Sequence, residues 1–504
     1  MNDLKPFIYG VLAILVIYGT RSFVFRSKID AIPSIGCLGV FYLGAFRFLR
    51  HGEEMVQEGY KKYNGVIFKV PFLSRWGFVA TGPALVKEIF HTPDDILSLN
   101  EAMHDALQVD LTLGPEIRED PHHIQSALAH FTRTLGRSFP EMRDEVICAF
   151  DDILGASEKD WKPVPVLSTI MPIVSRVSNR LFVGSRLCRD PEFLKFSMQH
   201  TVDVVVAGRL IGFLPNFLRP VFGPLISSRK RNMRQAMKML GPLVTDRMAM
   251  HEEHGTDWAG KPSDLISSLL EIAQPNQRNV YSIVQRILIV ILAAIHTSSI
   301  TFGSVLLDLA TYQHYIQPLR EEVESVVEKY GWTKAALNNM HKIDSFIRES
   351  QRMNGLNCLA SARMVVHPDG FRFSDGTFLP RGSIVNVPIR AIHHDSEFHP
   401  EPEVFDALRS YNMDSSTSDL NPESRTSKHR LVTTEPTHLS FGHGKHACPG
   451  RFFAAAELKA MLAHIVMNYD VKLEIEGVRP PDQVFEIFRV PDPKAKVCFR
   501  KRKV

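Results

Sequence analysis

The chain lacks the residue patterns of several common protein classes. Its 504 residues include only six cysteines, and no two of them stand at the spacing of a disulfide framework or a paired metal-ligand motif. That scatter favours a reducing compartment. The sequence also contains no Gly-x-Gly-x-x-Gly dinucleotide fingerprint, no iron-sulfur cysteine cluster and no internal repeat. A net charge of +4 is modest at this length, so no nucleic-acid partner is expected.

Composition and periodicity predict one large, mainly α-helical body with small β-sheets. With 44% apolar residues, the chain can bury a large core and a prosthetic group without disulfides. Helices are expected at about 83–90, 141–154, 191–206, 228–253, 263–272, 283–309 and 318–329. Short strands are expected at about 66–70, 76–80, 371–373, 384–387, 471–476 and 497–500. Residues 411–436 are polar and lack an apolar period, which predicts a surface insertion without chemistry.

The N-terminal 28 residues have the composition of a membrane anchor. The stretch 6–25 is mostly apolar, close to the ~20 residues that a bilayer needs. Arg26 and Lys28 follow it, so the positive-inside rule keeps residues 29–504 on the cytosolic side. A cleaved secretory signal is the alternative, but no convincing small-x-small cleavage site precedes the basic cluster. Residues 1–28 are therefore predicted to be a single-pass anchor, with its basic flank, in the endoplasmic reticulum membrane.

The most informative segment is the run Phe441 to Gly450, which reads Phe-Gly-His-Gly-Lys-His-Ala-Cys-Pro-Gly. Its glycines permit a tight turn that exposes the sulfur of Cys448, and Pro449 keeps that cysteine out of ordinary strand pairing. A strongly helical pattern starts at Arg451, which places a helix N-terminus beside the sulfur and offsets negative charge there. These features are what a metal-ligating thiolate requires.

Two other interpretations of Cys448 are weaker. A lone cysteine is usually a small buried apolar residue, but the surrounding glycines and aromatic residues are costly to keep for packing alone. A zinc site is the second alternative, with the ligand set Cys448, His438, His443 and His446. A single residue separates His446 from Cys448, which is too short for the usual paired-ligand loops, and no second cysteine lies nearby.

The run resembles the haem-binding signature of the cytochrome P450 family, Phe-x-x-Gly-x-Arg-x-Cys-x-Gly. Every position matches except the arginine, which is His446 here. The resemblance implies a b-type haem (heme b) whose iron is bound by the Cys448 thiolate. It implies further cofactor contacts from Phe441, Gly442 and Gly450. The implied architecture is the cytochrome P450 fold, mainly α with small β-sheets, preceded by the single N-terminal transmembrane helix, with residues 29–504 as the haem-thiolate catalytic domain.

The haem propionates of such a protein need cationic partners. His446, at the place of the family's arginine, and Arg363, where the family has an arginine after its Glu-x-x-Arg helix, are expected to bind them. The family's early Trp/His-x-x-x-Arg pattern has no match near residues 122–127, because no arginine follows at that spacing. His123, Arg133 and Arg137 stay open as substitutes.

Glu349 and Arg352 provide a second, independent signal. They stand three residues apart in a helical stretch and can pair on one helix face. Such pairs are common on solvated surfaces, so the spacing alone says little. Their place about a hundred residues before Cys448 resembles the family's Glu-x-x-Arg motif. The family completes a Glu-Arg-Arg network from a later stretch, which makes Arg409 the expected third member, although Ser410 replaces the usual phenylalanine after it.

The long apolar stretch 283–309 contains the third signal, Ala-Ala-Ile-His-Thr-Ser-Ser at 293–299. It resembles the family's central helix, where a small residue leaves room for dioxygen and an acid-alcohol pair relays protons. By position Ala294 is the small residue, His296 replaces the acid and Thr297 is the alcohol. A histidine can still shuttle protons near neutral pH. The alternative is that these polar residues only bond preceding carbonyls and bend the helix.

The resemblance implies a monooxygenase that inserts an oxygen atom from O2 into a bulky apolar substrate. Since the chain has no dinucleotide or iron-sulfur motif, electrons are expected from NADPH-cytochrome P450 reductase, with cytochrome b5 as an optional second partner. The sequence around Cys448 and on the central helix resembles that of fungal members that oxidise terpenoids in secondary metabolism. This resemblance favours a diterpenoid or a triterpenoid as the substrate. The alternatives are a sterol oxidase, a haem-thiolate isomerase or dehydratase that needs no external electrons, and a non-enzymatic metal-binding protein.

Overall fold

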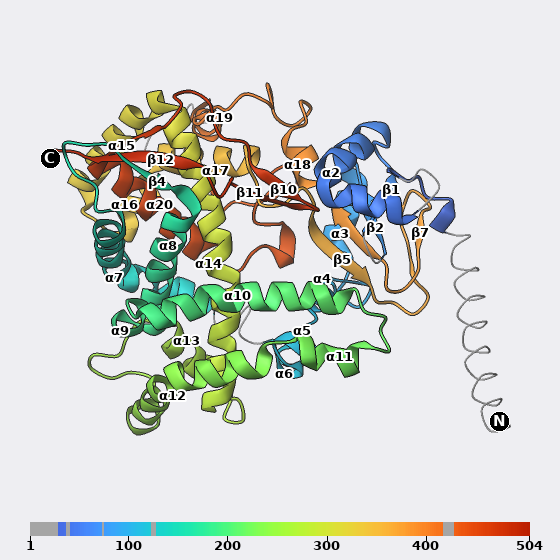
Figure 1. Cartoon of the computed structure of the whole chain (residues 1–504), viewed down its shortest axis with the longest axis horizontal. Helices are drawn as coiled ribbons and strands as arrows, with labels where there is room; N and C mark the ends of the chain where they lie inside the picture. Colours follow the sequence, from blue (N-terminus) through green and yellow to red (C-terminus); the bar gives the residue numbers. More distant parts are fainter. Residues whose placement is uncertain (1–28, 37–40, 73–74, 122–127, 417–427, 504) are drawn as a thin grey trace. The chain divides into compact units, whose positions relative to one another are not determined.

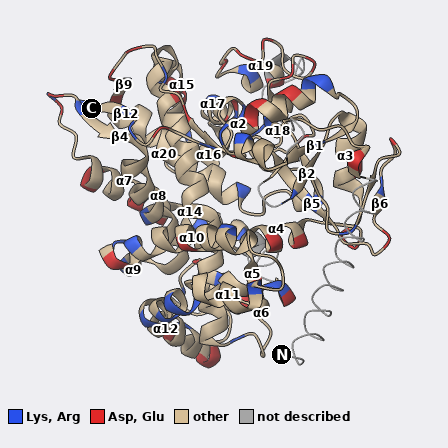
Figure 2. Ribbon diagram, turned by 45° about the vertical axis from the view of Figure 1, so that its right-hand side comes forward, with Lys and Arg blue, Asp and Glu red and all other residues tan. Residues whose placement is uncertain are grey.

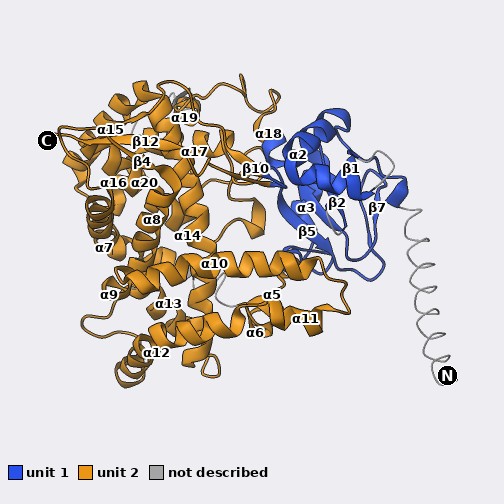
Figure 3. Cartoon of the chain, in the orientation of Figure 1, with its two compact units in different colours: residues 1–102, 358–391, 485–487 blue, residues 103–357, 392–484, 488–504 orange. Residues whose placement is uncertain are grey.

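A computed structural model describes residues 29–36, 41–72, 75–121, 128–416 and 428–503 (Figure 1). It separates into two compact units (Figure 3). Unit 1 comprises residues 1–102, 358–391 and 485–487, and unit 2 comprises residues 103–357, 392–484 and 488–504. Each unit combines segments that are far apart in the sequence. The predicted anchor, residues 1–28, lies outside the described residues.

Unit 1 is built on a five-stranded sheet with the strand order β1-β2-β8-β5-β3. The predicted strand pair is confirmed, because β1 runs antiparallel to β2 with Ile67 opposite Ala80. Strand β8 pairs parallel with β2, and β5 pairs antiparallel with both β8 and β3. The elements of this unit are α2 (Phe41–Lys62), β1 (Ile67–Pro71), β2 (Trp76–Ala80), α3 (Pro83–His91), β3 (Leu97–Ser98), β5 (Ala360–Val365), β6 (Phe371–Arg372), β7 (Phe378–Leu379) and β8 (Ile384–Val387).

Unit 2 is mostly helical and holds a three-stranded sheet, β4-β12-β9. Its helices are α5 (Val109–Thr112), α6 (Pro115–Glu119), α7 (Leu128–Leu154), α8 (Val166–Val183), α9 (Ser185–Cys188), α10 (Pro191–Gly212), α11 (Arg219–Ile226), α12 (Arg229–His254), α13 (Leu265–Ile272), α14 (Val280–Thr311), α15 (Ile316–Tyr330), α16 (Lys334–Asn339), α17 (His341–Met353), α19 (Arg409–Ser416) and α20 (Arg451–Asn468), with the 3-10 turns η2 (Gln313–Tyr315) and η4 (Gly444–His446). Its strands are β4 (Lys162–Pro165), β9 (Tyr469–Leu473), β11 (Phe488–Val490) and β12 (Lys496–Lys501). Three elements include residues of both units: α4 (Leu99–Leu107), α18 (Ile389–His393) and β10 (Gln483–Phe485).

Helix α14 runs through the core of unit 2. It starts at the N-cap Asn279, whose side chain accepts a hydrogen bond from the backbone N–H of Ser282 at 2.8 Å. Among the described residues it is the one helix long and apolar enough to cross a membrane, and 56% of its most apolar stretch is buried inside the protein, as expected of a core helix. Figure 2 shows few charged residues on α14, whereas α12 carries many basic residues.

Helix α7 begins earlier than the sequence predicted. The expected start was residue 141. The structure instead shows one helix from Leu128 to Leu154 with Pro140 inside it. Phe131, Leu135 and Phe139 lie before the proline and are buried in the main core, so tertiary packing outweighs the local cost of the proline.

The prediction of a surface insertion at 411–436 is wrong for parts of that segment. Its first six residues belong to helix α19. Leu431 is fully buried and donates its backbone N–H to the carboxylate of Asp344 on α17. The few apolar residues of this polar stretch carry too weak a periodic signal to reveal this packing. Residues 417–427 lie outside the described part of the chain.

Candidate active site

The segment Phe441–Gly450, which we call the ligand loop, forms a tight turn in unit 2. Gly442 and Gly444 adopt φ values of +68° and +69°, a region that favours glycine. The backbone N–H of Cys448 donates to the carbonyl of Phe441 at 2.8 Å and closes the loop, and helix α20 begins three residues later at Arg451. The local geometry that the sequence predicted around Cys448 is therefore present.

The surroundings of the Cys448 sulfur suit a cationic metal. Burial raises the pKa of the thiol, while the backbone N–H of Gly450, the Arg451 guanidinium and the backbone N–H of Arg451 act in the opposite direction. A Cβ added to Gly450 would lie 4.0 Å from the sulfur, which is an ordinary contact distance, so Gly450 borders the sulfur directly. Because the sulfur is sheltered and faces a helix start, a bound iron ion would stabilise its thiolate form.

The zinc alternative lacks a ligand set. Among the described residues, no group of three or more His, Cys, Asp and Glu side chains lies close enough together to hold a metal ion. His438 is buried and stacks on His393 at a ring-centroid distance of 5.0 Å. His443 instead lies 3.2 Å from the hydroxyl of Thr434 through its Nδ1 atom. The histidines near Cys448 therefore make structural contacts of their own.

Glu349, Arg352 and Arg409 come together in one buried network. Arg352 Nε and Nη2 each donate to a carboxylate oxygen of Glu349 at 2.8 Å, a bidentate ion pair with side chains 2% and 3% exposed. Arg409 Nε lies 3.3 Å from both Glu349 oxygens. Arg352 Nη1 also donates to the carbonyls of His393 and Pro402 at 2.7 and 2.8 Å. This pair is not one of the solvated surface pairs that its spacing alone would suggest.

The two residues predicted to bind propionates lie in different units. Arg363, on β5 of unit 1, is 3% exposed and donates to the carbonyls of Ser361 and Ala362 at 3.2 and 3.0 Å. Burial lowers its pKa to about 10, against the opposing attraction of Asp94. A buried cation whose hydrogen-bond acceptors are neutral carbonyls suits an anionic ligand. His446, in unit 2, is half-buried at the end of η4.

The open substitutes for the missing early arginine receive no structural support. Arg133 and Arg137 are both exposed on α7. His123 lies outside the described residues.

On α14, the segment Ala294–Thr297 has few polar contacts. Thr297 is exposed, and its hydroxyl donates to the carbonyl of Ala293 at 2.7 Å, with Ala294 a second acceptor at 3.3 Å. His296 Nε2 lies 2.9 Å from the carbonyl of Met198 on α10, so this nitrogen carries the proton and donates it. The structure thus anchors His296 to a neighbouring helix through its Nε2 atom.

Glu457 is a buried acid that the sequence analysis did not single out. It lies on α20 and accepts a hydrogen bond from the Ser178 hydroxyl of α8 at 2.6 Å. Burial raises its pKa to about 7, while the hydroxyls of Ser178 and Ser298 oppose that shift. The available signal was a glutamate within the mostly apolar stretch of α20, because a buried acid in such a helix needs specific partners.

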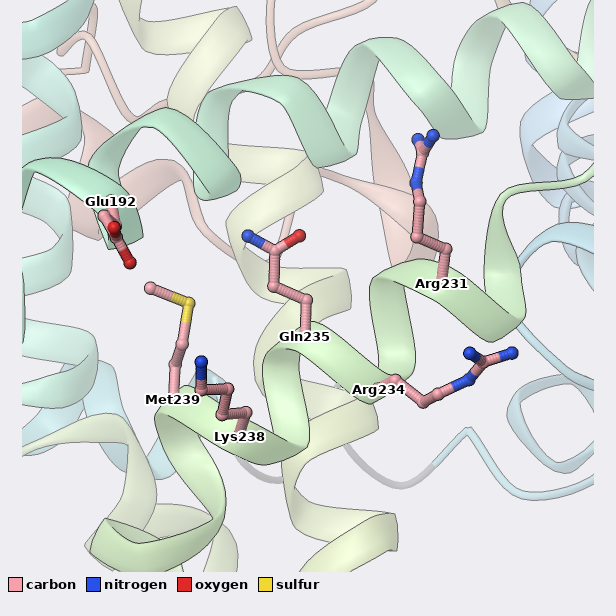
Figure 4. Close-up of a pocket in the computed structure, with 6 residues that line it drawn as sticks. All are labelled: Glu192, Arg231, Arg234, Gln235, Lys238 and Met239. Atoms are coloured by element: carbon pink, nitrogen blue, oxygen red, sulfur yellow. The ribbon is translucent and has the colours of Figure 1, made fainter.

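Helix α10 contributes both to an apolar cluster and to a polar cleft. Val109, Leu113, Ile117 and Val204 form a separate apolar cluster, against which Ile289 and Leu292 of α14 pack. A cleft of about 400 Å³ between α10 and α12 is instead polar (Figure 4). Its lining consists of Glu192, Arg231, Arg234, Gln235, Lys238 and Met239. The basic lining of this cleft does not suit the bulky apolar substrate that the family resemblance implies.

Fold and site together define a mainly helical protein that presents one cysteine sulfur on a glycine-rich turn before a helix. Comparison with known families agrees: the cytochrome P450 family model matches residues 36–499. The chain belongs to the cytochrome P450 family, and it is a monooxygenase with a haem-thiolate cofactor. The predicted family, fold class and cofactor are thus confirmed.

Three relatives illustrate the similarity. Cytochrome P450 monooxygenase 151 of Postia placenta is 40% identical over the full length of both chains. Cytochrome P450 monooxygenase CYP512U6 of Ganoderma lucidum is 31% identical over 100% of this chain and 97% of its own. Ent-kaurene oxidase of Gibberella intermedia is 30% identical over 94% of this chain and 88% of its own.

The fold is also that of a solved structure, the retinoic acid-bound cyanobacterial CYP120A1. Its TM-score to this chain is 0.66, and the superposition covers 93% of this chain and 99% of that one. Because the two sequences are only 19% identical, the likeness concerns the fold alone.

Proposed function

We propose that this chain hydroxylates a bulky apolar terpenoid, either a diterpenoid or a triterpenoid, with O2 and electrons that NADPH-cytochrome P450 reductase supplies. Cytochrome b5 is a second proposed electron donor. The proposed location is the endoplasmic reticulum membrane, with residues 1–28 as the anchor. The single observation that carries the assignment of the site is the ligand loop, in which Gly442, Gly444 and the start of α20 present Cys448.

Cys448 is the proposed iron ligand. When bound, a thiolate-ligated haem supplies the oxidising chemistry, since the sulfur donates electron density that favours O–O cleavage. The protein itself holds the sulfur in place. The hydrogen bond from the Cys448 N–H to Phe441 fixes the backbone, and the N–H groups of Gly450 and Arg451 favour the thiolate. Phe441, Gly442 and Gly450 are the proposed neighbours of the ring, and His446 and Arg363 the proposed propionate partners.

Ala294, His296 and Thr297 are the proposed residues of the oxygen site. The small side chain of Ala294 would leave room for dioxygen. The exposed hydroxyl of Thr297 would hold a proton donor in place, and His296 Nδ1 would take up and release protons. The same hydroxyl also bonds its own helix, so the helix-bending interpretation is an outcome of the test below.

The choice of an apolar substrate is supported by the apolar side chains around Val109 and Val204, against which Ile289 and Leu292 of α14 pack. Terpenoid chemistry is supported by a relative named ent-kaurene oxidase. A sterol would suit the same kind of lining, so the two substrate classes must be compared directly.

The test is turnover of the full-length protein with the reductase in oxygen-18-labelled O2, on a diterpene, a triterpene and a sterol. We expect one labelled oxygen atom in the product of a terpenoid, and none when either NADPH or the reductase is omitted. Labelled sterol alone would favour the sterol oxidase. An isomerised or dehydrated product that needs no NADPH would reveal the haem-thiolate isomerase or dehydratase. Zinc without iron in a metal analysis would mark a non-enzymatic metal-binding protein.

A further inference from the structure

His393, the last residue of α18, bonds directly to the segment that leads into the ligand loop. Its side chain is 1% exposed, and its Nε2 atom accepts the backbone N–H of Leu439 at 2.9 Å. Leu439 stands two residues before the ligand loop, and its own carbonyl accepts the N–H of Gly442 at 2.8 Å. The imidazole of His393 thus fixes the residue from which the loop turns.

The backbone of His393 is fixed in turn by the buried ion pair on α17. Arg352 Nη1 donates to the His393 carbonyl at 2.7 Å while the same guanidinium pairs with Glu349. A continuous series of bonds therefore leads from Glu349 through Arg352, His393 and Leu439 into the loop that ends at Cys448. Each of these bonds is buried or half-buried, where a lost hydrogen bond is costly.

The bond to Leu439 requires one state of the ring. A nitrogen that accepts an N–H carries no proton itself, so His393 must be neutral with its proton on Nδ1. The charged and titratable groups that face it are His438, stacked at 5.0 Å, His399 at 6.2 Å, His394, Arg352 and Arg348. Burial and the positive charges of these neighbours hold the pKa of His393 well below its ordinary range.

We propose that His393 is a positioning residue for the haem ligand: its neutral imidazole couples the Glu349–Arg352 pair to the loop that presents Cys448. The inference rests on the proposed ligation of iron by Cys448. It predicts that removal of the Nε2 acceptor disturbs thiolate ligation even where the fold is retained.

The test compares His393→Leu, which removes the acceptor, with His393→Gln, whose side-chain oxygen can replace Nε2. His438→Leu is the matched control, because His438 is equally buried in the same cluster and makes no bond to the Leu439 N–H. The readout is the share of the reduced, carbon-monoxide-bound protein that shows the red-shifted thiolate band. We expect His393→Leu to lower this share about tenfold relative to His438→Leu, with substantial rescue in His393→Gln.

A pH arm separates positioning from mere packing. A neutral histidine with a lowered pKa contributes its full stability above the ordinary histidine pKa and loses it as the pH falls toward the folded value. Wild type should therefore lose the thiolate band on acidification while its helical circular dichroism is still native. His393→Gln should keep the band to a pH about one unit lower.

The two proposals fail in different ways. Absence of the red-shifted band in wild type would refute ligation by Cys448. A normal wild-type band with equal losses in His393→Leu and His438→Leu, or with no rescue and no pH shift in His393→Gln, would refute the positioning role while leaving the ligand assignment intact.

Discussion

The ligand loop and the α14 segment Ala294–Thr297 are held in very different ways. Around the loop, Arg352 and His393 make buried bonds to other segments of the chain, and the Cys448 N–H closes the loop on the carbonyl of Phe441. On α14, the Thr297 hydroxyl is exposed and bonds to carbonyls of its own helix. We infer that substitutions around the ligand loop are costly, because several bonds fix it at once. The α14 segment has fewer such bonds, which fits the presence of His296 where the family has an acid.

The largest loss of haem-loaded protein is expected when the buried Glu349–Arg352 ion pair is broken. Glu349→Gln leaves the Arg352 guanidinium, 2% exposed, without its counter-charge, a loss on the order of 3–5 kcal/mol for a buried pair. We expect little or no haem-loaded protein, measured as haem content per chain after purification.

The control for that variant is Glu474→Gln, which breaks the half-exposed pair with Lys496 at 3.3 Å. Such a surface pair contributes about 0–1 kcal/mol, so haem content should stay normal. Normal haem content and stability in Glu349→Gln as well would mean that the buried network does not support the site.

A second effect of a few kcal/mol concerns the acid on α20. The pKa of Glu457 is raised from 4.5 to about 7, so the folded state holds its proton more tightly than the unfolded chain. Stability from this group is present below pH 4.5 and is lost as the pH rises through about 7. At pH 8 the loss is on the order of 3 kcal/mol, at roughly 1.4 kcal/mol per unit.

Glu457→Gln cannot ionise and should therefore raise the melting temperature at pH 8 more than at pH 5. Thermal unfolding of both proteins at the two pH values measures this. An equal change at both pH values would show that the carboxyl does not titrate in this range.

The sequence could predict much of the ligand side because its signals are local or at a family spacing. Glu349 and Arg352 are three residues apart, and the glycines of the ligand loop adjoin Cys448. His393 could not be found in this way, since its partner Leu439 lies 46 residues away and no local pattern joins them. Leu431 and the start of α7 were missed for a related reason: their placement depends on tertiary packing, which outweighs local propensity.

In the α14 segment, Thr297→Ala should lower the fraction of electrons that lead to product and should leave the fold intact. Haem content, the thiolate band and NADPH consumption should stay near wild type. In the proposed role the alcohol orders the protons delivered to the oxygen site, so its loss should divert most reducing equivalents to hydrogen peroxide. The coupling ratio, product formed per NADPH consumed, measures this.

Ser299→Ala is the matched control for Thr297→Ala. Ser299 makes the same kind of bond to a carbonyl four residues earlier, at 2.6 Å, on the buried face of the same helix. We expect unchanged coupling in this control. Unchanged coupling in Thr297→Ala too would reduce Thr297 to a helix-bending residue.

The smallest effect is expected at His296. His296→Ala removes the proposed proton carrier and also the bond to Met198, so the whole cycle should slow several-fold while coupling changes less than in Thr297→Ala. Steady-state NADPH consumption across pH 6 to 8 measures it. A rate and a pH profile equal to those of wild type would exclude His296 from proton delivery.

The most direct test of the account is the reduced, carbon-monoxide-bound absorption spectrum of wild type, Cys448→Ala and Cys358→Ala. Cys358 is a matched buried thiol, 2% exposed, whose pKa burial raises to about 12. We expect a strongly red-shifted Soret band in wild type and in Cys358→Ala. We expect complete loss of that band in Cys448→Ala. A red-shifted band that survives in Cys448→Ala would contradict the assignment of the iron ligand.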